Sequence, residues 1–159
     1  MIILGIDPGI ADTGFGIVEA NHGEYKALAH GSIVTKKTDT LTNRLQELFD
    51  ELSALIKKHK PERVAVESLF FAKNAKTALT VAHARGVILL AGRKAGCAVE
   101  EYTPLQVKQA LTGYGAADKN QIQQMVKTVL QLDEIPKPDD AADALAIAIC
   151  AAQTQHYAR

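Results

Sequence analysis

The sequence predicts an α/β protein in which helices flank a mixed five-stranded sheet, with an antiparallel meander followed by parallel strands. One observation is the unbroken apolar run in residues 1–6, which is typical of a strand that is buried on both faces. Another is the short Val-rich segment RVAVE at residues 63–67, which follows a helical pattern and is therefore expected to pair parallel to the first strand. A chain of 159 residues with 47% hydrophobic content can bury one well-packed core, so we expect residues 1–159 to form a single domain.

The first strand ends in an acidic residue, Asp7. Pro8 and Gly9 then break the strand, and an apolar pattern restarts at Phe15, which predicts a hairpin with a carboxylate at its mouth. After a turn, residues 25–30 and residues 31–35 are expected to form two further strand segments of the meander. Taken alone, Asp7 is more typical of a turn or a helix cap than of a catalytic group.

Apolar residues recur at steps of three and four from Leu41 to Ile56 and predict an amphipathic helix. This helix ends in the basic run of residues 57–60. Cations in a last turn suit the helix macrodipole, so we interpret the run as a solvated helix end rather than a nucleic-acid site. The strand that follows ends in Glu67, and two acid-terminated strands favour a functional site because α/β sheets bind ligands at that edge.

The connection SLFFAKNAK, residues 68–76, combines aromatic and basic side chains. Phe70 and Phe71 cannot both enter one core from a short loop, so at least one is expected at the surface. Together with Lys73 and Lys76 they suit stacking on an unpaired base beside phosphate. Composition alone is equally compatible with two core phenylalanines.

Three elements are expected after this connection. A helix over residues 77–94 contains Gly86, which allows another element to approach closely, for example in a homodimer. Residues 97–102 form the predicted last strand. An N-cap threonine followed by proline then begins a short helix that is closed by Gly113 and carries Lys108.

A further helix is predicted by the capping-box spacing of Asp118 and Gln121. Lys119 therefore lies near a helix N-terminus, where a cation opposes the macrodipole. That placement indicates phosphate contact, with a solvated surface lysine as the alternative.

An Ala-rich helix is expected over residues 139–152, and three aspartates open it. Asp140 and Asp143 are three residues apart and share a face, whereas Asp139 lies about 100° around the helix and should face elsewhere. Acidic residues in the first turn stabilise a helix by interacting with its macrodipole. Two carboxylates on a face that packs inward are nevertheless better explained as metal ligands.

Four carboxylates converge if the two acid-terminated strands are neighbours and the last helix packs across their ends. They are Asp7, Glu67, Asp140 and Asp143. The charges of four neighbouring carboxylates repel one another unless cations neutralise them. Ligand sets made only of oxygen atoms select hard ions such as Mg²⁺ or Mn²⁺. Two ions about 4 Å apart can hydrolyse a phosphodiester.

Charge and cysteine content restrict the class of protein further. The chain has 18 basic and 18 acidic residues, so a polyanion must be held by a local patch or by metal. Two distant cysteines and the absence of a secretory pattern predict a cytoplasmic protein, and the longest apolar stretch, residues 77–92, falls short of a membrane span.

Four motifs, in order and over nearly the whole chain, resemble those of the RuvC family of Holliday junction resolvases, which have an RNase H-like fold. They are GIDPG with G-x-G after it, VAVESLFFAKN, VKQALTGYGAADKNQ and PDDAADALAIAI. The resemblance implies that Asp7, Glu67, Asp140 and Asp143 are the catalytic acids that bind the metal, with Asp139 outside the set. It also implies that Phe70, with Phe71 beside it, stacks at the junction, and that Lys108 and Lys119 lie near the scissile phosphate.

The resemblance further implies a homodimer that acts in recombination and repair, together with a branch-migration helicase complex. Its substrate would be four-way junction DNA, resolved by paired symmetric nicks that leave 5′-phosphate and 3′-hydroxyl ends. Two alternatives keep the same fold: a nuclease for structured RNA and a non-catalytic nucleic-acid-binding domain. An actin-like ATPase is disfavoured, because that architecture needs a duplicated domain that 159 residues cannot supply.

Overall fold

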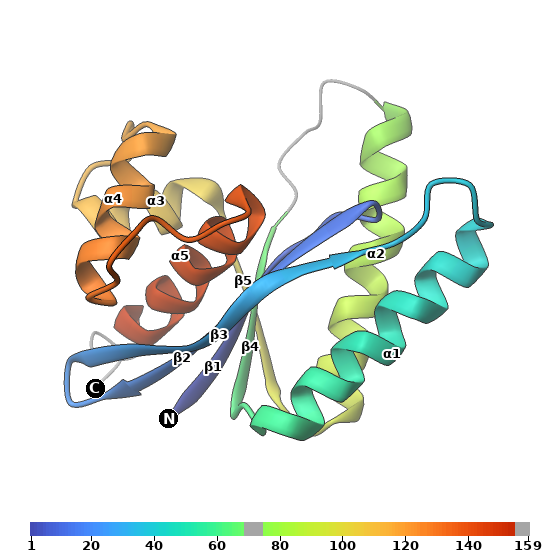
Figure 1. Cartoon of the computed structure of the whole chain (residues 1–159), viewed down its shortest axis with the longest axis horizontal. Helices are drawn as coiled ribbons and strands as arrows, with labels where there is room; N and C mark the ends of the chain where they lie inside the picture. The colour runs from blue at the N-terminus through green and yellow to red at the C-terminus, as the bar shows by residue number, and fades with distance from the viewer. Residues whose placement is uncertain (69–74, 155–159) are drawn as a thin grey trace.

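The computed structural model describes residues 1–68 and 75–154, with side chains described for all of these except residues 75–77. Within these residues the chain forms five strands and five helices (Figure 1). The strands are β1 (Ile2–Asp7), β2 (Asp12–Asn21), β3 (Glu24–Val34), β4 (Arg63–Glu67) and β5 (Ala98–Tyr102). The helices are α1 (Leu41–His59), α2 (Ala75–Lys94), α3 (Pro104–Thr112), α4 (Lys119–Val129) and α5 (Asp139–Thr154).

The strands form one mixed sheet in the order β3-β2-β1-β4-β5. β1 pairs antiparallel with β2 and parallel with β4, and β4 pairs parallel with β5. The predicted five-stranded sheet, with its antiparallel meander and parallel strands, is confirmed. β1 and β4 are central neighbours, so their carboxyl ends lie at the same edge of the sheet.

The prediction of two strand segments at residues 25–30 and 31–35 is wrong, because β3 is a single continuous strand. Gly31 pairs with Phe15 of β2 inside this strand instead of beginning a new segment. A Cβ atom at Gly31 would lie 3.1 Å from the Phe15 ring. The glycine therefore makes room for an aromatic side chain across the strand pair.

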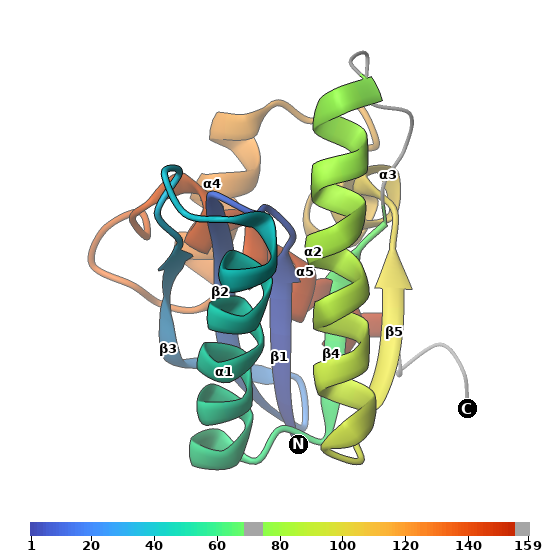
Figure 2. The same ribbon diagram turned by 90° about the vertical axis from the view of Figure 1, so that its right-hand side faces the viewer.

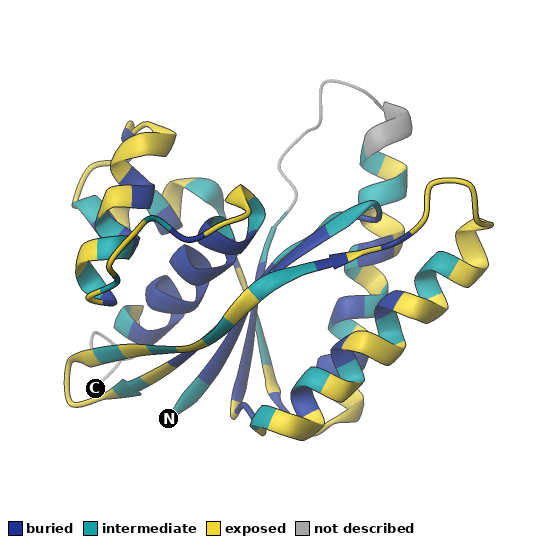
Figure 3. Cartoon of the chain, viewed as in Figure 1, coloured by how far each residue is buried: buried dark blue, intermediate teal, exposed yellow. Residues whose placement is uncertain are grey.

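Helices cover both faces of the sheet. α1 and α2 lie side by side on one face, and α3, α4 and α5 lie on the other (Figures 1 and 2). Each face of the sheet has its own hydrophobic core, and β1 contributes to both. Ile3 packs towards α5, whereas Leu4 and Ile6 pack towards α1 and α2. The central strands and α5 are accordingly the most deeply buried elements (Figure 3). No helix in the described ranges is both long enough and apolar enough to cross a membrane.

Substitution of Gly5 is expected to destabilise this packing strongly. A Cβ atom there would lie 2.1 Å from the Ala144 carbonyl oxygen of α5, so the helix would have to move off the sheet. We expect Gly5→Ala to lower the free energy of unfolding by about 3 kcal/mol. Gly86→Ala is the matched control: Gly86 has open space around its Cβ position and lies within α2, so alanine should stabilise by up to about 1 kcal/mol. Urea denaturation of both variants checks the prediction, and equal stability of the two would contradict it.

Candidate active site

Strand alternation places two of the predicted acids on the same face of the sheet. Ile3 of β1 and Ala65 of β4 belong to the core beneath α5. Successive side chains of a strand point to opposite faces, so Asp7 and Glu67 also lie on the α5 face, at the ends of their strands.

Glycines in β1 and β2 bring α5 down onto these acids. A Cβ atom at Gly14 would lie 2.0 Å from the Asp140 carbonyl oxygen, which shows how closely the first turn of α5 crosses β2. Gly14 is also the residue of β2 that pairs with Asp7. Asp140 is therefore held next to the end of β1 by backbone contact that only glycine permits.

The structure brings the four predicted acids to one edge of the sheet. Asp7, Asp140 and Asp143 each offer a carboxylate oxygen, and these three atoms lie within 4.8 Å of one another. Glu67 lies beside them, close enough that its charge helps to raise the pKa of Asp7. This acidic cluster is assembled from β1, β4 and α5, which are distant in the sequence.

Burial and mutual repulsion disfavour full ionisation of the acidic cluster. Burial, followed by the charges of Glu67, Asp143 and Asp140, raises the pKa of Asp7 to about 8. The pKa values of Glu67, Asp140 and Asp143 are raised as well, in each case first by burial. A bound cation would relieve this repulsion, and the all-oxygen donor set fits a hard divalent ion. The residues present therefore fit a metal site.

The raised pKa of Asp7 predicts a pH dependence of stability in metal-free protein. Between its ordinary pKa of 3.8 and about 8, folded Asp7 holds a proton that the unfolded chain has released. The folded state thus binds more protons, so the free energy of unfolding should fall as the pH rises through this range. Thermal denaturation at several pH values, with a chelator present, measures the slope. Asp7→Asn should flatten it, and an unchanged slope in that variant would contradict the assignment.

Lys119 interacts directly with the acidic cluster. Its Nζ lies 3.4 Å from Asp143 Oδ2 and 3.3 Å from Asp139 Oδ2. The predicted capping box is present, with the Asp118 side chain accepting from the Gln121 N–H, and it fixes Lys119 in the first turn of α4. Desolvation alone would lower the pKa of Lys119, but Asp143 and Asp139 outweigh it and raise that pKa. The ammonium group therefore stays charged at the edge of the cluster.

Sequence reasoning missed a contact of Asp139. This residue is exposed and outside the acidic cluster, but its carboxylate accepts a hydrogen bond from Gln123 Nε2 at 3.3 Å as well as pairing with Lys119. Asp139 therefore anchors the cation that touches Asp143. The available signal was the spacing of Lys119 and Gln123, which are four residues apart and share one face of α4.

Asp12, at the start of β2, was also missed. Its charge is among the causes that raise the pKa of Asp140, after burial. Its Oδ1 is buried and has no hydrogen-bond partner among the described residues. No pattern in the sequence singled Asp12 out.

A cavity of about 210 Å³ opens beside the acidic cluster. Glu67, Asp143, Lys108 and Lys119 line it, and its remaining walls are mostly apolar side chains of α3, α4 and α5. Lys108 is half-buried on α3, whose predicted Thr103 cap is present. Both lysines that were singled out from the sequence thus reach the cavity that the acids line.

The side chains of the aromatic and basic residues in the 68–76 connection lie outside the described part of the chain. Phe70, Phe71 and Lys73 lie outside the described residues. Lys76 belongs to α2, but its side chain lies outside them too. Their proposed role in DNA binding stays a prediction.

Comparison with known proteins gives consistent matches. A family model described as crossover junction endodeoxyribonuclease RuvC matches residues 3–151. Crossover junction endodeoxyribonuclease RuvC of Desulforamulus reducens is 58% identical over 153 residues, covering 96% of this chain and 94% of the relative. A structure of Thermus thermophilus RuvC in complex with Holliday junction substrate is 34% identical and superposes with a TM-score of 0.91, covering 99% of this chain and 96% of that one. A second Thermus thermophilus RuvC structure is 36% identical, with a TM-score of 0.92 over 99% of this chain and 97% of that one.

Proposed function

The chain belongs to the RuvC family of crossover junction endodeoxyribonucleases, and from this premise we propose that it cleaves Holliday junctions at the acidic cluster of Asp7, Glu67, Asp140 and Asp143. Its mixed sheet with flanking helices is the RNase H-like fold of that family. The observation that carries the proposal is the set of three carboxylate oxygens within 4.8 Å of one another, beside Glu67.

The four carboxylates would hold two Mg²⁺ ions, for which Mn²⁺ can substitute. Ions held by these residues would activate a water and stabilise the leaving oxygen of the phosphodiester. Asp7 is fixed for this role by a central strand that is paired on both sides, which holds its carboxylate between α5 and Glu67.

Lys108 and Lys119 would bind the scissile phosphate. Both line the cavity that Glu67 and Asp143 also line, so a phosphate there would contact cations and metal together. This placement lets a chain with zero net charge hold a polyanion at one point. Phe70, Phe71, Lys73 and Lys76 would contact unpaired bases and phosphates near the junction centre.

The active form would be a homodimer. Resolution needs one nick in each of two strands, and the described residues of this chain contain a single cluster of acids able to hold metal. Two copies would supply the two nicks. A branch-migration helicase complex would be the further partner, a proposal that rests on the family resemblance alone.

Incubation with a synthetic four-way DNA junction, with and without Mg²⁺, tests this function. We expect paired, symmetric, metal-dependent nicks that leave 5′-phosphate and 3′-hydroxyl ends, mapped on each strand. A structured RNA of similar size serves as competitor, and preferential cleavage of the RNA would contradict the proposal. Binding of the junction without cleavage in Mg²⁺ or Mn²⁺ would instead favour the non-catalytic alternative.

A further inference from the structure

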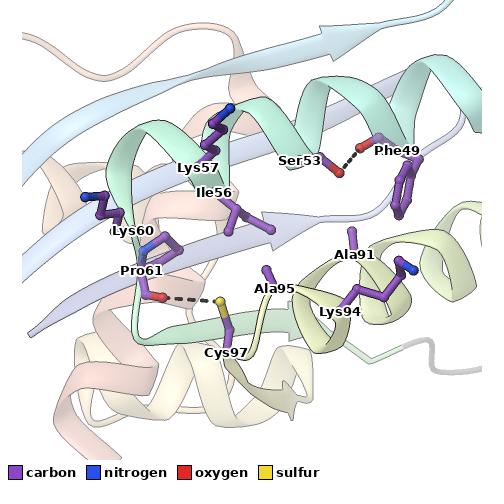
Figure 4. Close-up of a pocket in the computed structure, with 10 residues that line it drawn as sticks. All are labelled: Phe49, Ser53, Ile56, Lys57, Lys60, Pro61, Ala91, Lys94, Ala95 and Cys97. Carbon is purple, nitrogen blue, oxygen red and sulfur yellow. Dashed lines mark hydrogen bonds between the residues drawn. The ribbon is translucent and has the colours of Figure 1, made fainter.

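A second concave region lies at the opposite edge of the sheet from the acidic cluster, between the C-terminal ends of α1 and α2 (Figure 4). This groove has a volume of about 490 Å³. It includes Pro61, just before β4, whereas Glu67 ends that strand at the acidic cluster. A strand of this length separates the two regions by roughly 15 Å.

The floor of the groove is apolar. Phe49 and Ile56 come from α1, Ala91 from α2, and Pro61 and Cys97 from the segments that precede β4 and β5 (Figure 4). The Cys97 thiol donates a hydrogen bond to the Pro61 carbonyl oxygen at 3.2 Å, which ties these two segments together. An apolar floor of this kind favours a ligand with a hydrophobic side chain.

Three lysines surround this floor, and no acidic residue lines the groove. Lys57 and Lys60 come from the end of α1, and Lys94 comes from the end of α2 across from them. Among the described residues, none of these three ammonium groups has a carboxylate within ion-pair distance. The groove therefore presents uncompensated positive charge around an apolar surface.

The helix macrodipole explains only part of this arrangement. It accounts for cations in the last turns of α1 and α2, as we inferred for the basic run from the sequence. It does not account for the apolar floor between the two helices. The combination points to a ligand with both negative charge and an apolar group.

We propose that this groove binds an acidic peptide segment of a partner protein, with one large apolar side chain on the floor and carboxylates against Lys57, Lys60 and Lys94. A peptide can place a large apolar side chain on the floor formed by Phe49, Ile56 and Ala91 while its carboxylates lie beside the lysines. A nucleic-acid backbone has phosphates for the lysines but no apolar side chain for this floor. The structure thus favours a peptide over DNA at this site.

Fluorescence anisotropy with a labelled peptide that carries one phenylalanine among glutamates tests the proposal on the full chain. We expect the double variant Lys57→Glu/Lys94→Glu to bind this peptide about tenfold more weakly than wild type. The matched control is Lys58→Glu/Arg93→Glu, which changes the same charges in the same two helical turns at residues that do not line the groove. This control should bind within about twofold of wild type, because surface charges outside a contact contribute little.

A third variant, Ala95→Trp, fills the groove without changing its charge. It should weaken peptide binding by a factor similar to that of Lys57→Glu/Lys94→Glu. Junction cleavage should be unchanged in all three variants, which separates this proposal from the proposed nuclease function. Failure of the peptide to bind wild type would overturn the proposal. So would an equal loss in both double variants, equal binding of a peptide with serine in place of phenylalanine, or displacement of the peptide by a short DNA duplex whose binding depends on the same lysines.

Discussion

Replacement of Asp7 by asparagine is expected to abolish Mg²⁺-dependent cleavage of a four-way junction while the protein still binds the junction. The amide keeps the size of the side chain but removes a charged ligand from the centre of the acidic cluster, next to Glu67, Asp140 and Asp143. A metal ion contributes several kcal/mol to stabilisation of the transition state, so we expect a loss of about a thousandfold or more. Single-turnover cleavage and a binding assay on the same junction measure the two properties separately.

The matched control for this variant is Asp50→Asn, the same chemical change at an exposed position on α1. It should cleave at the wild-type rate. Without metal, Asp7→Asn should also melt at a higher temperature than wild type at neutral pH, because it removes a buried carboxyl group from a repelling cluster. Lost cleavage combined with raised stability would exclude misfolding as the cause, and cleavage at the wild-type rate would contradict the assignment of Asp7.

Local signals predicted most of the fold correctly. Thr103 with Gln106 and Asp118 with Gln121 form the capping boxes that begin α3 and α4, so these helix starts could be derived from the sequence. The expected break before Gly31 was wrong, because a glycine in a strand pattern resembles a strand boundary. The role of Gly31 depends on the Phe15 ring of the neighbouring strand, which no local pattern contains.

The convergence of the acids was also predictable, because it follows from strand parity and parallel pairing. Asp7 and Glu67 end neighbouring strands, and their side chains lie on the same face of the sheet. Helical spacing places Asp140 and Asp143 on one face of α5.

The spacing of Lys119 and Gln123 indicates only that they share a face of α4. Their contact with Asp139 depends on how α4 packs against α5, which no local pattern predicts. The groove between α1 and α2 could not be predicted from the sequence either, since the basic run of residues 57–60 alone indicates only a helix end.

Replacement of Lys119 by alanine is the second change from which we expect a large effect. Its ammonium group is the cation seen in contact with the acidic cluster, and it lines the cavity where we propose that the scissile phosphate binds. Removal of one preorganised group that stabilises charge in a transition state lowers a rate by about a hundredfold. We expect that loss in the single-turnover rate, and Lys119→Arg should recover part of it because the charge is kept.

Lys137→Ala distinguishes a catalytic position from a general charge effect. Lys137 pairs with the same Asp139 carboxylate, at 3.5 Å, but is not among the groups that contact Asp143 or line the cavity. Its removal should change the cleavage rate less than about threefold, as is usual for an exposed ion pair. If Lys119→Ala and Lys137→Ala reduce cleavage equally, the contact of Lys119 with Asp143 has no role in the reaction. A large loss in Lys119→Ala alone would place this ammonium group at the phosphate, because the two variants remove the same charge from the same carboxylate.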